Sequence, residues 1–323
     1  MKKYDVAAIG ELLVDFTENG VSGRGNPVLE ANPGGAPCNV LSMLQKLGKR
    51  TAFIGKVGSD AFGKMLIEAV KEQGINTDNI IMDEEVPTTL AFVHTGADGE
   101  RSFSFYRNPG ADMMLRGGDI DEKILLDTKI FHFGTLSMTD GHIAQTTAEA
   151  VQKAKKAGAI ISFDPNFRPP LWKNPDEAKR RMWYGISQCD ILKISDDEIT
   201  FLTGRKDIEA GAAIISEKYS PALICATMGR DGSRAYYKGK NVFCAPFLRE
   251  DTIETTGAGD TFMACVLNAV LEKGLDMLTE DDLFHMLKFA NAASSIITTR
   301  KGALRVMPHR DEIISLISQR KDD

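Results

Sequence analysis

The segment 255–260 is the part of the sequence best suited to chemistry, because it reads Thr-Thr-Gly-Ala-Gly-Asp and leads directly into an apolar helical stretch at 263–271. Small residues at a helix N-terminus leave backbone N–H groups open, and these donors, with the helix dipole, favour an anion such as a phosphate. Asp260 places a carboxylate beside this site, and phosphoryl transfer needs both a base for the attacking hydroxyl and positive potential for the phosphoryl oxygens. The alternative is that Asp260 only caps the helix and that the glycines form its entry turn.

A second glycine-containing loop, Thr-Met-Gly-Arg-Asp-Gly at 227–232, lies between predicted strands at 222–226 and 234–237. A Gly-x-x-Gly run between two strands is ordinarily a hairpin turn. The functional alternative is that its backbone amides approach the phosphates of a nucleotide.

A third loop, at 32–39, reads Asn-Pro-Gly-Gly-Ala-Pro-Cys-Asn and precedes a predicted helix at 37–47. A loop that ends with a proline in the first helical turn explains the whole segment. Alternatively, Gly34 and Gly35 admit a ligand close to the backbone, and Asn39 offers an amide to its hydroxyl groups.

Three polar residues follow or end predicted parallel strands, namely Glu11, Asp164 and Lys193. Open α/β sheets bind ligands at the carboxyl edge of their strands. Each residue alone is explained as a strand end or a surface charge. Together with the glycine loops, however, they favour one shared cleft.

The segment 58–64 looks like a P-loop but does not complete one. It follows a predicted strand, opens a helix and matches the first seven positions of the motif. Met65 stands where Ser or Thr must hold magnesium, so we reject a P-loop phosphotransferase.

Apolar runs of strand length alternate with longer segments of helical period, which is typical of a parallel sheet covered by helices on both faces. We therefore predict an α/β fold over 1–323, in one domain. The predicted strands are at 6–10, 51–57, 130–134, 159–164 and 191–194, and the predicted helices are at 37–47, 61–73, 143–156, 178–187, 259–273 and 281–299.

Two stretches, 12–31 and 88–107, break the alternation and are predicted as β-strands. Each lies between βα units and is too short to form a core of its own. We therefore predict that they combine into a small β lid over one edge of the main sheet. Exposed strand edges on such a lid also allow two copies of the chain to pair as a homodimer.

Composition excludes several classes of protein. Lys and Arg total 39 against 45 Asp and Glu, without a basic stripe for nucleic acid. The five cysteines and five histidines are scattered without metal-ligand spacing, which favours buried thiols in a reducing compartment. The N-terminus is too charged for a signal peptide, and no apolar run approaches the roughly 20 residues of a membrane helix. These features predict a cytoplasmic protein with small-molecule partners.

The residues described so far resemble the ribokinase-like (PfkB) carbohydrate kinases, and within that family most closely the fructokinases. The similarity covers nearly the whole chain, and the 255–260 segment is its most specific element. The other matching segments are Gly-Glu-Leu-Leu-Val-Asp at 10–15, Pro-Gly-Gly-Ala-Pro-Cys-Asn-Val at 33–40, Ile-Gly-Lys-Val-Gly at 54–58 and Asp-Pro-Asn-Phe-Arg at 164–168.

This resemblance implies a doubly covered sheet with a β lid, and ATP with Mg²⁺ as cofactors. It also implies that Asp260 takes the proton from a sugar hydroxyl, while the amides of Gly257, Ala258 and Gly259 hold the charge on the transferred phosphoryl group. Glu198 would help to organise magnesium. The implied sugar or phosphate contacts are Asp15, Gly34, Gly35, Asn39 and Arg168, and Glu11, one of the strand-end residues above, is added to them as a substrate contact. The implied ATP contacts are Lys193, Thr227, Gly229, Gly232 and Asn291.

Two positions depart from the family pattern. The family motif Asn-x-x-Glu appears here as Ser195-Asp196-Asp197-Glu198, so the carboxylate is kept and its amide partner is replaced by a shorter hydroxyl. Glu254 replaces the aspartate that usually precedes the 255–260 motif and belongs to a monovalent-cation site. We therefore do not assume activation by potassium.

The sugar is inferred from the resemblance alone, with fructose phosphorylated at its 6-hydroxyl as the first choice. Arg107 either meets a substrate carboxylate, which favours 2-keto-3-deoxygluconate, or pairs with an acidic residue of the lid at the surface. Another ribokinase-like kinase is a further alternative. A non-catalytic sugar sensor on the same fold is the alternative of a different class, although retention of Asp260 argues against it.

Overall fold

The residues described by the computed structural model, 2–95 and 101–320, build two sheets of unequal size. In the larger, seven neighbouring strands run parallel and two more, β12 and β13, return antiparallel at one edge. The strand order is β13 (Lys240–Cys244), β12 (Ser233–Tyr237), β11 (Leu223–Thr227), β10 (Ile191–Ser195), β9 (Ile160–Asp164), β8 (Thr128–Gly134), β1 (Tyr4–Ile9), β4 (Thr51–Gly58) and β5 (Asn76–Asp83).

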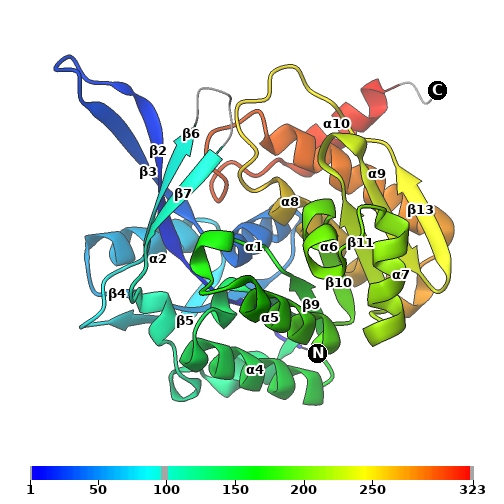
Figure 1. The fold of residues 1–323 in the computed structure, drawn as a ribbon, viewed down its shortest axis with the longest axis horizontal. Helices are drawn as coiled ribbons and strands as arrows, with labels where there is room; N and C mark the ends of the chain where they lie inside the picture. Colours follow the sequence, from blue (N-terminus) through cyan, green and yellow to red (C-terminus); the bar gives the residue numbers. More distant parts are fainter. Residues whose placement is uncertain (1, 96–100, 321–323) are drawn as a thin grey trace.

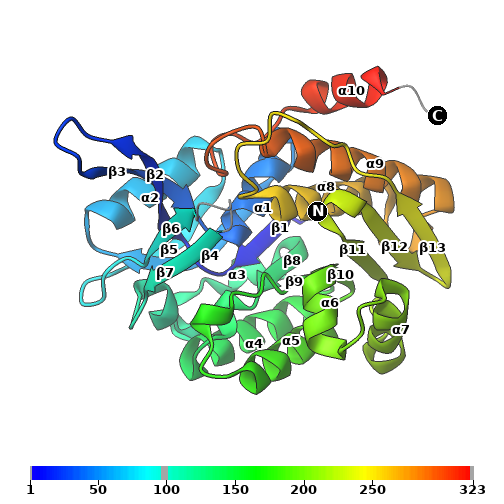
Figure 2. The same cartoon turned by 45° about the horizontal axis from the view of Figure 1, so that its top comes forward.

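Helices cover both faces of this sheet, as the alternating apolar pattern predicts (Figures 1 and 2). The helices of one layer share a single apolar core with the sheet. They are α1 (Ala36–Lys46), α2 (Ala61–Glu72), α8 (Ala258–Lys273), α9 (Glu280–Ile297) and α10 (Arg310–Gln319). The other contains α3 (Glu122–Leu126), α4 (Gly141–Lys156), α5 (Pro175–Gln188), α6 (Asp196–Thr203) and α7 (Ile208–Tyr219). The central strands are thus buried on both sides.

The smaller sheet is the predicted β lid, and its strand order is β3 (Pro27–Gly34), β2 (Leu13–Val21), β6 (Leu90–Thr95) and β7 (Arg101–Tyr106). Figure 1 shows the β2–β3 hairpin extending away from the body of the molecule. β3 continues to Gly34, beyond the predicted limit at 31. The part of the predicted lid at 96–100 lies outside the described residues.

Aromatic side chains join the lid to α2. The Phe16 ring lies edge-on to Phe62 of α2, with centroids 5.6 Å apart, and stacks on Phe92 of the lid at 5.0 Å. Such pairs add to the free energy of packing beyond the area they bury. The base of the lid is therefore held by side-chain packing as well as by its chain connections.

Two backbone amides of the 58–64 turn donate hydrogen bonds to side chains of the protein. The Gly58 N–H donates to Thr88 Oγ1 at 3.0 Å, and the Gly63 N–H donates to Asp60 Oδ1 at 2.7 Å. Asp60 therefore caps α2, and these amides are engaged within the protein. This geometry agrees with rejection of a P-loop.

The five cysteines are buried free thiols, as their apolar surroundings predict. Within residues 2–95 and 101–320, no cluster of three or more His, Cys, Asp or Glu side chains has a geometry suited to a metal. In the same residues, no helix has both the length and the apolar character needed to cross a membrane.

Candidate active site

The 255–260 segment forms the entry to α8, where Gly257 is the residue before the first helical turn. Gly257 has φ +78°, and a Cβ on it would lie 2.8 Å from the Ala303 Cβ, so both conformation and space require glycine. No partner within the described chain is present for the N–H of Gly257 or Gly259. The Ala258 N–H differs from the prediction, because it donates to the Thr255 carbonyl at 3.2 Å. Two of the three predicted amides are therefore open to an anion.

Asp260 lies in the first turn of α8 and does not cap it. Its side chain is buried, and its two carboxylate oxygens accept hydrogen bonds from Asn39 Nδ2 at 2.9 Å and Asn166 Nδ2 at 3.3 Å. Burial raises the pKa of Asp260, although the Asn39 hydrogen bond and the Lys193 and Arg168 charges oppose the rise. The two amides fix the carboxylate in place, and its raised pKa makes it a stronger base.

A buried ion pair lies beside the start of α8, where Lys193 Nζ is 3.1 Å from Asp164 Oδ2. Burial raises the pKa of Asp164 against the opposing charge of Lys193. Burial disfavours the Lys193 ammonium, but the charges of Asp164, Glu198 and Asp260 raise its pKa and keep it protonated. A Cβ on Gly259 would lie 2.9 Å from Lys193 Nζ. The ammonium therefore supplies positive potential directly beside the open amides.

Glu198 holds two segments of the site together. Its Oε1 accepts from the Phe167 N–H at 2.8 Å and its Oε2 from the Ser195 N–H at 2.9 Å, while Ser195 Oγ accepts from the Glu198 N–H at 3.3 Å. Ser195 and Glu198 thus form a capping box at the start of α6. The Ser195 hydroxyl that replaces the family's amide has this capping role.

A cavity of about 670 Å³, here called the lid-side cavity, lies between the lid, the start of α1 and the start of α8. It gathers eight of the predicted residues, and Leu13, Phe105 and Leu136 supply apolar walls. The predicted residues that line it are Glu11, Asp15, Gly35, Asn39, Arg168, Gly257, Gly259 and Asp260.

Glu11 is buried at the base of this cavity, and its Oε1 accepts a hydrogen bond from the Ala36 N–H at 2.9 Å. Burial raises the pKa of Glu11 to about 7, against the lowering effects of this backbone bond and of Arg107. Gly34 does not line the cavity. A Cβ on Gly34 would overlap the Asp15 carboxylate, and one on Gly35, at φ +130°, would overlap the Glu11 carbonyl. Crowding by the chain itself therefore accounts for both glycines.

Arg107 is buried under the lid rather than exposed on it, and it lines neither large cavity. Its Nη2 lies 2.6 Å from Asp112 Oδ2, its Nη1 donates to Thr139 Oγ1 at 2.7 Å, and its Nη2 donates to the Leu136 carbonyl at 2.8 Å. The acidic partner is Asp112, which lies in the 3₁₀ turn Ala111–Met114 after the lid and not in the lid itself. The pair is buried, not at the surface, because β7 ends against the main domain here.

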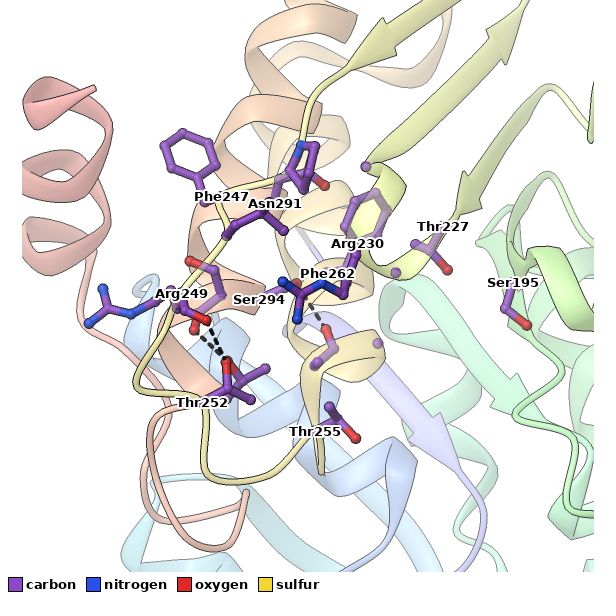
Figure 3. Close-up of a pocket in the computed structure, with 18 of the residues that line it drawn as sticks. Ser195, Thr227, Arg230, Phe247, Arg249, Thr252, Thr255, Phe262, Asn291 and Ser294 are labelled. Atoms are coloured by element: carbon purple, nitrogen blue, oxygen red, sulfur yellow. Dashed lines mark hydrogen bonds between the residues drawn. The ribbon is translucent and has the colours of Figure 1, made fainter. Parts of the chain in front are cut away.

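A second cavity, of about 460 Å³, is called the α9-side cavity because α9 forms one wall (Figure 3). Its lining includes four residues that the resemblance implied as ATP contacts, Thr227, Gly229, Gly232 and Asn291, together with Ala258 and Gly259. The side-chain amide of Asn291 is already hydrogen-bonded within the protein. It donates to the Cys244 and Ala245 carbonyls at 3.1 and 3.2 Å and accepts from Ser233 Oγ at 2.9 Å. Asn291 thus anchors the end of β13 beside the cavity.

The two cavities meet at the start of α8. Thr255 and Gly259 line both, whereas Asp260 lines only the lid-side cavity. Lys193 and Glu198 line neither cavity and lie behind the junction. A group transferred from the α9-side cavity to the lid-side cavity would pass the open amides of the helix terminus.

A family model described as pfkB family carbohydrate kinase matches residues 3–310. The chain belongs to this family. This PfkB kinase is 39% identical over 314 residues to probable fructokinase-2 of Arabidopsis thaliana, which covers 97% of this chain and 95% of the relative. The fold resembles a fructokinase with bound ATP from Xylella fastidiosa, with a TM-score of 0.88 at 33% identity over 98% and 99% of the two chains. It also resembles a Vibrio cholerae fructokinase in a fructose, ADP and calcium ion bound form, with a TM-score of 0.86 at 27% identity over 97% and 98%.

Several site residues of this PfkB kinase were not predicted as such. Asn166 holds Asp260 from the turn after β9, where its φ is +47°. Asparagine is one of the few residues that tolerate this conformation, so Asp-Pro-Asn at 164–166 carried a usable signal. Phe105 and Arg230 carried no such signal, because each faces its cavity only through the tertiary fold.

Proposed function

We propose that this PfkB kinase transfers the γ-phosphoryl group of ATP to the 6-hydroxyl of fructose, with Asp260 as the general base. The main support for this proposal is that the two cavities meet at Thr255 and Gly259. Asp260 lines the lid-side cavity and not the α9-side cavity. A donor in the α9-side cavity and an acceptor in the lid-side cavity would then face each other across the open amides. Such positioning with electrostatic stabilisation accounts for most of the catalysis of phosphoryl transfer.

In this mechanism Asp260 accepts the proton of the sugar hydroxyl as that oxygen attacks phosphorus. Asn39 and Asn166 keep the carboxylate oriented through the step. The Gly257 and Gly259 amides and the Lys193 ammonium stabilise negative charge on the phosphoryl oxygens. Water is kept out by the lid, whose Asp15 and Phe105 line the acceptor cavity.

Magnesium bound to the ATP phosphates would neutralise part of their charge. Among the described residues, Asp164 Oδ2 is buried without a hydrogen-bond partner, although it pairs ionically with Lys193. Glu198 has both oxygens in hydrogen bonds with the backbone, and each oxygen keeps a further lone pair. Neither carboxylate lines either of the two cavities, so each would act on the ion only through its water ligands.

Similarity to fructokinases, including the Vibrio cholerae structure in its fructose- and ADP-bound form, supports fructose as the acceptor. The engagement of Arg107 with Asp112, Thr139 and the Leu136 carbonyl weakens the argument for a substrate carboxylate at this residue. A neutral hexose fits the Glu11, Asp15 and Asn39 side chains, which offer hydrogen bonds to hydroxyl groups.

A coupled ADP-release assay tests the choice of acceptor. With ATP and Mg²⁺, we expect kcat/KM for fructose to exceed that for 2-keto-3-deoxygluconate, ribose, glucose and a purine nucleoside by at least about 100-fold, since several buried hydrogen bonds would discriminate. A preference for the keto acid would overturn fructose but keep the kinase. Absence of turnover with every sugar would favour the non-catalytic sensor.

A further inference from the structure

Arg230 is a charged residue of the α9-side cavity that the mechanism above does not use. It lies in a short 3₁₀ turn, Gly229–Asp231, between β11 and β12. The Asp231 N–H donates to the Met228 carbonyl at 2.9 Å, and the Met228 N–H donates to the Gly232 carbonyl at 2.9 Å. These bonds fix the turn, and Figure 3 shows the Arg230 side chain directed from it into the cavity.

The Arg230 guanidinium is available to a ligand. Within residues 2–95 and 101–320 it has neither an ion pair nor a hydrogen bond, and its side chain is exposed. Asp231 follows it directly without pairing to it. A guanidinium presents five donors in a planar fork that matches phosphate oxygens. An unpaired arginine directed into a concave site therefore favours an anionic ligand.

The position of Arg230 narrows the choice of anion. The lining of the cavity includes Ala258 and Gly259 of the helix terminus and the apolar side chains of Pro246 and Phe247. In Figure 3 the Arg230 side chain lies between Phe247 and Thr255. A nucleotide with its transferred phosphate at the helix terminus and its base near Phe247 would place its inner phosphates beside Arg230.

We propose that Arg230 binds the phosphates of the nucleotide that are not transferred, the α- and β-phosphates, and so contributes to affinity for both ATP and ADP. This inference rests on the proposed function, in which the nucleotide occupies the α9-side cavity. Its contribution to affinity can be measured without turnover, because the α- and β-phosphates are present in both ATP and ADP.

Arg249 provides a matched control. It also lies at the α9-side cavity, but its Nε and Nη2 donate to Asp251 at 2.8 and 2.7 Å, and Figure 3 shows it directed away from the cavity. Arg230→Ala and Arg249→Ala each remove one positive charge near the same cavity. Any loss of general attraction for anions is therefore common to both variants.

Isothermal titration of the wild type and both variants with adenosine, AMP and ADP tests the proposal without turnover. We expect Arg230→Ala to weaken ADP binding about tenfold and adenosine binding by less than about twofold, as for loss of one charge-assisted contact to phosphate. Arg249→Ala should change each affinity by less than about twofold. Arg230→Lys should recover part of the ADP affinity but not all of it.

Three results would overturn the proposal: unchanged ADP binding in Arg230→Ala, an equal loss for adenosine and ADP, or an equal loss of ADP binding in both alanine variants. None of these results would argue against nucleotide binding in the α9-side cavity. A wild-type protein that binds neither adenosine nor ADP would instead contradict the proposed function, so the two failures are distinguishable.

Discussion

Asp260→Asn is expected to lower kcat for fructose phosphorylation by about 10²–10⁴-fold, because the hydroxyl proton then has no carboxylate to receive it. KM for fructose should change by less than about threefold, since asparagine preserves the shape of a side chain that Asn39 and Asn166 hold in place. Steady-state kinetics, with fructose and ATP varied separately, measure the effects on kcat and on KM.

The matched control is Asp207→Asn, which makes the same chemical change at the start of α7. Asp207 caps that helix by accepting from the Ala210 N–H at 2.7 Å, and asparagine caps helices equally well. Asp207 lines neither cavity, so the Asp207→Asn variant should keep the wild-type kcat. If Asp260→Asn keeps kcat within about tenfold of the wild type, Asp260 is not the base.

Lys193→Met is expected to lower the free energy of unfolding by about 3–5 kcal/mol, because it leaves Asp164 as an uncompensated buried carboxylate. Kinase activity should fall as well, since the Lys193 ammonium and the open amides together stabilise negative charge on the phosphoryl group. Without Lys193 the pKa of Asp164 rises further above its unfolded value, so folding takes up a proton. Stability of this variant therefore falls as pH rises from about 5 to 8. Urea denaturation across that pH range measures both effects.

The double variant Asp164→Asn with Lys193→Met separates stability from catalysis. Removing the buried carboxylate should recover part of the lost unfolding free energy and flatten its dependence on pH. Activity should stay low, because no positive charge remains beside Gly259. Wild-type stability in Lys193→Met at pH 8 would show that the pair does not hold this part of the fold together.

Features with a local or periodic signal could be predicted from the sequence. Alternation of strand and helix periods predicted the doubly covered sheet, and the two interrupting segments predicted the lid. The predicted start of the helix at 259 lies one residue from the observed start of α8 at Ala258. Each of these rests on residues near one another in the chain.

Side-chain pairing across the fold could not be predicted in the same way. Asn39 and Asp260 are 221 positions apart, and nothing in the spacing of either loop indicates that they meet. Arg107 was expected at a substrate or at the surface, yet β7 delivers it to Asp112 under the lid. Asn291 is engaged by the Cys244 carbonyl and the Ser233 hydroxyl, and Glu198 by the Phe167 N–H, through the packing of segments that are distant in the chain.

The central claim is transfer of a phosphoryl group from one cavity to the other at Asp260, and product analysis tests it most directly. Wild-type protein with fructose, ATP and Mg²⁺ would be followed by ³¹P and ¹³C nuclear magnetic resonance. We predict that fructose 6-phosphate and ADP form in equal amounts. Formation of ADP and inorganic phosphate without a sugar phosphate, or a phosphate on another hydroxyl, would contradict the account.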